Sequence, residues 1–498
     1  MSSTNPVHPD LPTLPDAPAE IRHLIGGEWR AGGVLVDVHS PYSGEVIARV
    51  PLADEPTVDA CVAAAKAASV DWRGTPLKER TQRLFRFREL LLRDLDTLAH
   101  LCSSESGKTV VEARAGIMKG VEVIEFALSI QNLDDGAVLE VSRGVSCEVR
   151  REPLGVVVGI TPFNFPAMVP MWLFPIAVTV GNAFVLKPSE KVPLTAVAMA
   201  ERMVEAGFPP GVFSVLHGDK AAVRALARHA DVAALAFIGS TPVARAVYVD
   251  ATSSGKRALC LGGAKNHLIV VPDADRDVAV DGIVRSFTGC AGQRCMAASL
   301  MVAVGDVRSI LDAACERAKS MVLGRDMGAI IDATALERLH KALQAARAEG
   351  AAIRVDGRNA PAPKGFEGGY WLGPTILEAK PEMDCAKTEL FGPVLTVVHV
   401  ETLEEAMALG DANVYGNATS VFTTRGAVAR FVAARAQAGM IGVNVGVPVP
   451  REPFSFGGTK ASRFGMGDIT GRAAIELWSE QKKITTKWSM QSDMNWMS

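Results

Sequence analysis

The sequence lacks the marks of several common classes of protein. Its 52 Lys and Arg against 55 Asp and Glu give a net charge of -3 at pH 7. Because there is no basic excess, we expect neither a nucleic-acid partner nor binding to an anionic membrane. The eight cysteines include no Cys-x-x-Cys pair, and no His cluster has the spacing of zinc ligands, so we expect no metal site. Such sparse cysteine also argues against a disulfide framework and favours a reducing, cytoplasmic setting.

The N-terminal region lacks a basic start followed by an apolar run. Prolines recur at positions 6, 9, 12, 15 and 18, which favours a flexible tail over residues 1–20 rather than a signal peptide. One later stretch, 167–186, is almost wholly apolar. It contains Pro170, Pro175 and Gly181 and stands inside a globular pattern, so we expect a buried core helix there rather than a membrane span.

Strands alternate with helices over most of the chain. Buried strands are expected at 155–160, 183–187, 212–216 and 234–238, each followed by a helix, and a second such series starts with a strand at 268–271 and runs to about 449. This alternation is typical of parallel sheets with right-handed crossovers. It predicts an α/β fold of two Rossmann-like domains, with ligands bound beyond the carboxyl ends of the strands.

Residues 286–295 carry the clearest sign of chemistry. Cys295 follows a glycine-rich turn that lets a substrate approach the backbone closely. Its neighbour Arg294 favours the thiolate, the reactive form of cysteine. The segment is therefore a candidate for covalent catalysis. By contrast, we expect Cys290 and Cys315 to be small core residues.

The first α/β series has no Gly-x-Gly-x-x-Gly fingerprint. At a strand-to-helix turn it has Gly239 and Ser240, which could hold a phosphate or form an ordinary turn. Beyond another strand it has Lys187 and Glu190, which could take the two hydroxyls of a ribose or form a surface ion pair.

Six motifs in this order give the chain a recognisable resemblance. They are Thr-Pro-Phe-Asn-Phe-Pro at 161–166, Lys-Pro-Ser-Glu at 187–190, Phe-Ile-Gly-Ser at 237–240, Leu-Gly-Gly at 261–263, Gly-Gln-Arg-Cys at 292–295 and Glu-Leu-Phe-Gly-Pro at 389–393. Together they resemble the aldehyde dehydrogenase superfamily over nearly the whole chain. Residues 159–170, Gly-Ala-Lys-Asn-His at 263–267 and Arg-Cys-Met at 294–296 resemble its CoA-acylating methylmalonate-semialdehyde dehydrogenase branch.

The resemblance implies a role for each motif. Cys295 would attack an aldehyde, with the oxyanion held by the Asn164 amide and the Cys295 backbone N–H. NAD would lie in a cleft, and a carboxylate at Glu190 would repel the 2′-phosphate of NADP. The residues implied for the cofactor are Thr161, Phe163, Lys187, Glu190, Lys191, Gly239, Ser240, Gly262, Glu389 and Phe391.

The same resemblance implies a short anionic aldehyde of the malonate-semialdehyde type. Arg294 would face the substrate carboxylate, Phe165 would border the substrate, and Lys119 would stand where the branch has a second Arg. Lys keeps the charge but loses the bidentate fork of Arg, which leaves other short anionic aldehydes open.

Position 260 departs from the pattern of the hydrolytic members. They carry a Glu there that activates water, whereas this chain has Cys260. A thiol is a poor general base near neutral pH, so coenzyme A is expected to take the acyl group from Cys295. Two alternatives stay open: an enzyme that releases a free acid, and a non-catalytic binding protein on the same fold. The presence of Cys295, Asn164 and Glu389 argues against the second.

The resemblance also suggests how the chain is divided. We expect the tail at 1–20, an NAD-binding domain at 21–135 and 153–260, a catalytic domain at 261–469, and oligomerisation elements at 136–152 and 470–498. The alternating hairpin at 138–150 and a last strand at 483–488 are exposed edges that invite pairing. A homodimer or homotetramer is therefore expected.

Overall fold

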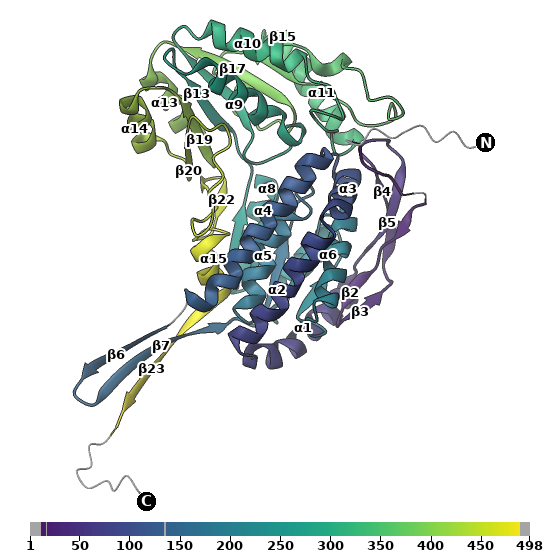
Figure 1. Ribbon diagram of the computed structural model, residues 1–498, viewed down its shortest axis with the longest axis vertical. Helices are drawn as coiled ribbons and strands as arrows, with labels where there is room; N and C mark the ends of the chain where they lie inside the picture. Colours follow the sequence, from purple (N-terminus) through teal and green to yellow (C-terminus); the bar gives the residue numbers. More distant parts are fainter. Residues whose placement is uncertain (1–10, 16, 134–135, 489–498) are drawn as a thin grey trace, which may run out of the picture.

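The computed structural model describes residues 11–15, 17–133 and 136–488 and is built on two large sheets (Figure 1). The first has the order β22-β12-β11-β8-β9-β10-β2-β3, and the second β15-β16-β17-β14-β13-β19-β20. In the first sheet, the strands are β2 (His23–Ile25), β3 (Glu28–Arg30), β8 (Val156–Ile160), β9 (Ala183–Lys187), β10 (Phe213–Val215), β11 (Val232–Ile238), β12 (Arg257–Leu261) and β22 (Arg463–Phe464). The second holds β13 (Asn266–Val270), β14 (Ala298–Val304), β15 (Ala352–Val355), β16 (Thr375–Glu378), β17 (Val394–Val400), β19 (Ala418–Phe422) and β20 (Met440–Val443).

Both sheets are parallel in their centres, as the alternation of strands and helices predicts. In the first sheet β8 pairs in parallel with β9 and β11, and in the second β14 pairs in parallel with β13 and β17. Antiparallel pairs occur at the margins, between β2 and β10, β12 and β22, and β15 and β16. The α/β class predicted from sequence is confirmed.

Helices cover both faces of the first sheet. One face carries α2 (Leu77–Arg93), α3 (Leu95–Ser106), α4 (Val110–Ser129), α5 (Met168–Thr179) and α6 (Pro193–Glu205), and the other α1 (Glu55–Gly74), α7 (Lys220–Arg228) and α8 (Thr241–Ser253). Because side chains of a strand alternate between faces, Val157 of β8 joins the first core while Val156 and Val158 join the second. Every residue of α5 is buried, which confirms a core helix in the apolar stretch 167–186.

The second sheet is covered in the same way. Its helices are α9 (Arg276–Thr288), α10 (Arg308–Lys319), α11 (Ala333–Ala348), α12 (Asp384–Lys387), α13 (Leu403–Ala412) and α14 (Gly426–Arg435). Short 3-10 turns occur at η1 (Ile130–Asn132), η2 (Gly289–Gly292) and η3 (Gly357–Asn359). Among the described residues, no helix combines the length and the apolar character that a membrane crossing requires.

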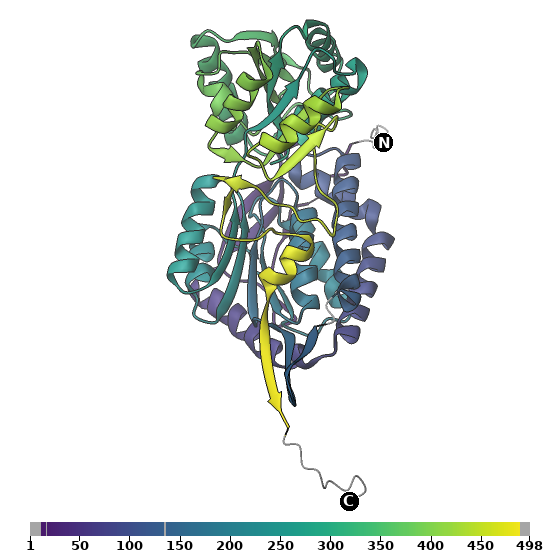
Figure 2. The same ribbon diagram turned by 90° about the vertical axis from the view of Figure 1, so that its left-hand side faces the viewer.

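A narrow three-stranded arm projects from the body (Figures 1 and 2). It consists of β6 (Ala137–Ser142), β7 (Val145–Pro153) and β23 (Ser479–Lys487), and of these only β23 directly follows α15 (Gly471–Trp478) in the chain. The predicted hairpin pairs β6 with β7, and the predicted last strand pairs along the other side of β7. Val138 and Leu139 on β6 are 72% and 66% exposed.

The smaller elements bear on the predicted boundaries. A third sheet joins β1 (Ala19–Glu20), β5 (Val46–Leu52) and β4 (Val34–His39), and a two-stranded one joins β18 (Tyr415–Gly416) to β21 (Thr459–Lys460). Residues 19–20, expected in the flexible tail, are thus a strand because β5 offers them a parallel edge. Strand β22, expected in the catalytic domain, pairs with β12 of the first sheet. The remaining division into domains stays a prediction.

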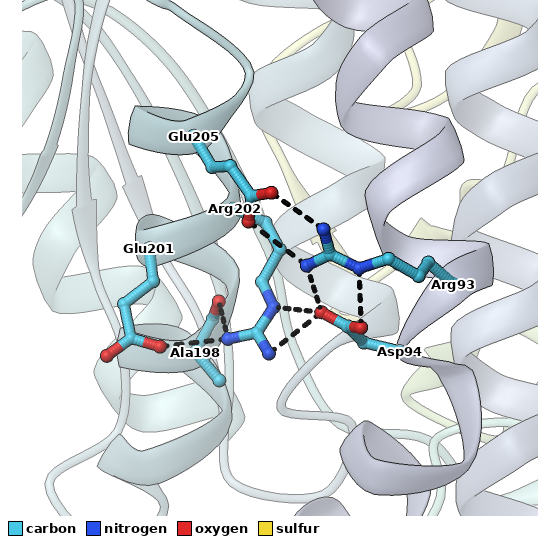
Figure 3. A network of polar contacts seen from close by, with 6 residues as sticks. All are labelled: Arg93, Asp94, Ala198, Glu201, Arg202 and Glu205. Carbon is cyan, nitrogen blue, oxygen red and sulfur yellow. Dashed lines mark hydrogen bonds and ion pairs between the residues drawn. The ribbon is translucent and has the colours of Figure 1, made fainter.

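A polar network ties the junction of α2 and α3 to α6 (Figure 3). Arg93 forms two hydrogen bonds with Asp94 and two with Glu205, at 2.6–3.0 Å. Arg202 of α6 donates to the same Asp94 at 3.0 Å. Hydrogen bonds from Arg93, and then the contacts with Arg202, lower the pKa of Asp94 to about 2.

We expect Asp94→Asn to lower the free energy of unfolding by about 1 kcal/mol at pH 7, as for a partly exposed ionic network. Because folding lowers the pKa of Asp94, its carboxylate stabilises the folded protein fully at pH values above the unfolded pKa of about 3.9. That contribution is lost as the pH falls through the folded value of about 2. Urea unfolding of the wild type and Asp94→Asn measures the difference in the free energy of unfolding at pH 7 and its loss near pH 2. Glu201→Gln is the control, since Glu201 contacts Arg202 only at the exposed end of the network; an equal loss in both variants would contradict the prediction.

Candidate active site

A cleft of about 800 Å³ opens at the carboxyl ends of the first sheet. Thr161 follows β8, Lys187 ends β9, and Gly239 follows β11, so chain direction alone brings these residues to one edge. The cleft is lined by Thr161, Phe163, Asn164, Phe165, Lys187, Glu190, Lys191, Gly239, Ser240, Gly262, Cys295, Glu389 and Phe391 among the residues singled out from the sequence. Lys119 and Arg294 are absent from this lining.

The nucleophile loop, defined here as residues 289–295, is held in an unusual backbone conformation. Cys290 and Ala291 have φ of 53° and 51°, in the left-handed region that residues other than glycine rarely adopt. Gly292 follows at φ 68°, and a Cβ there would lie 2.0 Å from the Gly392 carbonyl oxygen. The loop therefore packs directly against the backbone after Phe391.

Two asparagines fix the backbone at Cys295 itself. The Cys295 carbonyl accepts hydrogen bonds from the side-chain amides of Asn266 at 2.7 Å and Asn417 at 2.9 Å. Asn266 begins β13 and Asn417 directly precedes β19, and both strands belong to the second sheet. Asn417 lies in no recognised motif, so no sequence pattern pointed to it.

Asn164 reaches the nucleophile loop from the first sheet. Its buried side-chain amide donates to the Gln293 carbonyl at 3.0 Å. Gln293 is itself fixed, since its side chain donates to the Ala329 carbonyl and accepts from the Ile331 amide. A side-chain amide has two donor hydrogens, so Asn164, which lines the cleft together with Cys295, has a second hydrogen that this contact does not use.

The thiol of Cys295 is largely protonated near neutral pH. Burial raises its pKa to about 12, and the Glu389 carboxylate adds to that rise. Arg294 acts in the opposite direction, as expected from the sequence, but its effect is smaller. Arg294 thus favours the thiolate, as the sequence predicts, but burial and Glu389 outweigh its effect on the pKa of Cys295.

The two cations expected near the substrate are engaged with other groups. Arg294 donates to the carbonyls of Arg285 and Ser286 at the end of α9, where a cation stabilises the last turn. Lys119 contacts Glu122 at 3.0 Å and Glu452 at 3.2 Å. Their substrate-binding role remains a prediction that these contacts do not support.

Glu389 lines the cleft, and the buried Lys265 lies outside the lining but close enough to interact with it electrostatically. Burial raises the pKa of Glu389 to about 7, and burial lowers the pKa of Lys265 to about 8. The Glu389 carboxylate lies over Gly263, where a Cβ would come within 2.3 Å of it. Phe391, at φ 53°, meets Phe163 edge to face across the cleft at 5.9 Å.

The outer part of the cleft is polar. Lys187 is buried and lies 3.2 Å from Glu190. Lys191 lies 2.5 Å from Asp332, which caps α11 on the second sheet, so this expected cofactor residue is already paired across the cleft. Sequence reasoning missed Arg338, which lines the cleft and donates to the Leu390 carbonyl at 2.6 Å, because it lies in a helix without a motif.

Cys260 lies away from this chemistry. It is fully buried on β12 and does not line the cleft. Burial raises the pKa of its thiol to about 12, so it is neutral near pH 7. Cys260 therefore cannot act as a general base that activates a water beside Cys295.

A cysteine nucleophile beside an amide donor, in a cleft at the carboxyl edge of a parallel sheet, defines a thiol-dependent enzyme with a nucleotide-sized groove. The model of the aldehyde dehydrogenase family matches residues 29–484. The chain belongs to the aldehyde dehydrogenase family.

Named relatives and solved structures cover almost the whole chain. It is 40% identical over 490 residues to the acylating, mitochondrial methylmalonate-semialdehyde dehydrogenase of Arabidopsis thaliana, covering 96% of this chain and 81% of the relative. It is 41% identical over 486 residues to the malonate-semialdehyde dehydrogenase of Pseudomonas aeruginosa, covering 95% and 97%. A solved structure from Sinorhizobium meliloti, complexed with NAD, matches with a TM-score of 0.94 at 40% identity, covering 96% and 99%.

We expect Cys295 to react with iodoacetamide at a rate that rises about tenfold for each pH unit between pH 7 and 9, without a plateau. The reason is that only the thiolate reacts and the raised pKa of about 12 keeps it a minor species over this range. Peptide mass mapping of the alkylated protein measures the rate at this site. A plateau near pH 8 would mean that the thiol is activated in the free enzyme.

Proposed function

We propose that the protein is an NAD-dependent, CoA-acylating semialdehyde dehydrogenase that acts on malonate semialdehyde or methylmalonate semialdehyde. The observation that carries the acylating part is Cys260, a buried neutral residue where hydrolytic members have a carboxylate. The names of the relatives at 40–41% identity support the substrate class. The NAD complex of the similar solved structure supports the cofactor.

The cleft residues fit a dinucleotide. The Ser240 hydroxyl caps no amide of α8 among the described residues, so this helix start is available for a phosphate. Lys187 and Glu190, which lie 3.2 Å apart in the cleft lining, would hold a ribose, and Glu190 would disfavour a 2′-phosphate. When bound, NAD would supply the acceptor for the hydride of the aldehyde.

The residues of this chain would then perform the remaining steps. The Cys295 thiol first releases its proton to water; the thiolate then adds to the aldehyde carbon, and the resulting oxyanion would be stabilised by the Asn164 amide and the Cys295 backbone N–H. Such donors each contribute about 3–4 kcal/mol to the transition state. Loss of the hydride leaves an acyl thioester on Cys295. Since water has no base at position 260, the thiol of CoA takes the acyl group and regenerates Cys295.

For the substrate carboxylate we propose Lys119 as the recognising cation; the resemblance of the sequence supports this role, while its contacts in the structure do not. Lys119 pairs with Glu122 and with Glu452, whose side chain is almost fully buried. To bind Lys119, the substrate carboxylate must therefore take the place of one of these two carboxylates. A single ammonium recognises charge more than shape. Short anionic aldehydes other than the malonate type therefore belong to the range to be assayed.

We expect NADH formation from malonate semialdehyde to stop after about one turnover per site without CoA and to continue with it, as an acyl enzyme without an acceptor requires. Rapid-mixing absorbance measures the burst, and mass spectrometry identifies the acyl-CoA product. Cys295→Ala should abolish both phases. Cys315→Ala, which removes a buried thiol far from the cleft lining, should abolish neither. Equal steady-state rates with and without CoA would overturn the acylating proposal in favour of free acid release.

We further propose a homodimer or homotetramer that pairs through the arm, and a cytoplasmic location. The arm exposes the apolar residues Val138, Leu139 and Val141, and an unpaired strand edge invites a second copy. All eight cysteines are free, which suits a reducing compartment.

Light scattering should therefore give two or four times the chain mass of 52.7 kDa. Leu139→Lys should shift the mass towards the monomer, because a charge cannot be buried unpaired at an apolar interface. Leu35→Lys is the control, since Leu35 is 47% exposed on β4, outside the arm. A monomeric wild-type protein would contradict the proposal.

A further inference from the structure

The strained nucleophile loop is held by one carboxylate from a distant helix. Cys290 donates its backbone N–H to Glu112 of α4 at 2.6 Å, across 178 residues of sequence. Cys290 and Ala291 are buried and left-handed. Residues in such conformations persist only where their surroundings fix them.

Glu112 is suited to this task because its position is fixed from the other side. Its second carboxylate oxygen accepts from the Thr109 amide at 3.1 Å, and its own amide donates to the Thr109 hydroxyl at 3.2 Å. This capping box starts α4. One oxygen thus binds the helix start while the other binds the loop that presents Cys295.

The start of α4 is joined to the same loop by a second route. The Gly107 carbonyl accepts from the Ala329 amide at 2.7 Å. Ala329 in turn accepts from the Gln293 side chain. Nearby, the Lys108 ammonium lies 3.9 Å from the ring centre of Phe165, which lines the cleft. The helix start and the nucleophile loop therefore form one hydrogen-bonded unit.

We propose that Glu112 is a positioning residue for catalysis: its carboxylate holds the left-handed Cys290–Ala291 backbone and so aims the Cys295 sulfur and its backbone N–H at the aldehyde. The proposal rests on the proposed function in taking Cys295 as the nucleophile. Small displacements of a reacting group cost about 100-fold in rate. Glu112 does not touch the aldehyde, so its effect falls on kcat more than on KM.

The test compares Glu112→Ala with two variants that weaken a capping box without touching the loop. Thr402→Ala removes the cap hydroxyl of an unrelated capping box, at the start of α13. Glu405→Ala removes the carboxylate of that same capping box. We expect Glu112→Ala to lower kcat about 10- to 100-fold, while both controls keep kcat within about threefold at a similar change in melting temperature.

Alkylation of Cys295 gives a reading that is independent of the aldehyde and of CoA. In Glu112→Ala the released loop exposes the thiol to water, where the thiolate forms more readily. Alkylation at pH 8 should therefore become faster while kcat falls. Because this reading needs no substrate, it separates failure of the positioning proposal from failure of the proposed substrate or acceptor.

Ala291→Gly supplies the decisive second variant, since glycine adopts the left-handed conformation without strain. Added to Glu112→Ala, it should restore at least about tenfold of the lost kcat. Glu112→Gln keeps one acceptor oxygen for two amides, so its kcat should lie between those of the wild type and Glu112→Ala. Adding Ala291→Gly should raise that kcat as well. If Glu112→Ala does not fold, Glu112→Gln with and without Ala291→Gly decides the question. Three outcomes would each overturn the proposal. They are a wild-type kcat and alkylation rate in Glu112→Ala, an equal loss of kcat in the controls, and no recovery of kcat on adding Ala291→Gly.

Discussion

The hydrogen bond from Asn164 to the Gln293 carbonyl is the contact on which the site depends. Asn164 follows β8 of the first sheet, while Gln293 follows α9 of the second series of elements. A donor aimed at an oxyanion is useful only if its distance from the nucleophile is fixed before the substrate arrives. Because the same amide binds the nucleophile loop and faces the cleft, the packing of the two sheets sets that distance.

The close approach of the two halves explains several glycines and several residues with an unfavourable backbone conformation. Gly292 touches the Gly392 backbone, and Gly263 lies under the Glu389 carboxylate, so neither position has room for a Cβ. Phe391 and Cys290 have positive φ, which the surrounding contacts must offset. Strain concentrated around one thiol is consistent with a site whose geometry, more than its flexibility, decides reactivity.

Much of this arrangement could be predicted from the sequence, for a simple reason. Motif residues such as Thr161, Lys187 and Ser240 follow strands, and parallel strands bring their carboxyl ends to one edge whatever the details of packing. Side-chain direction is different. Arg294 adjoins Cys295 in sequence, yet it turns to the end of α9, and nothing in a linear pattern distinguishes those two directions. Likewise Asn417 and Glu112 reach the loop through tertiary packing alone.

Electrostatics at the site also depends on what surrounds the groups rather than on which residues are neighbours in sequence. A cation beside Cys295 suggests an activated thiol. Burial and the nearby Glu389 carboxylate outweigh the effect of that cation, however, and raise the pKa of the Cys295 thiol. The same burial raises the pKa of Glu389 and lowers that of Lys265, so both lie near neutrality. A site of this kind favours neutral forms until a ligand changes its charge balance.

Burial at position 260 extends the same argument to the choice of acyl acceptor. A carboxylate there would need water or a partner to stay charged, and it would then serve as a base. Cys260 instead packs among apolar residues of the first sheet and carries no charge. Water near the acyl group therefore remains a weak nucleophile, whereas a thiol is about seven pKa units more acidic than water and forms its anion far more readily. Selection of a thiol acceptor thus needs no added group, because removing one carboxylate leaves the acyl enzyme intact until CoA arrives.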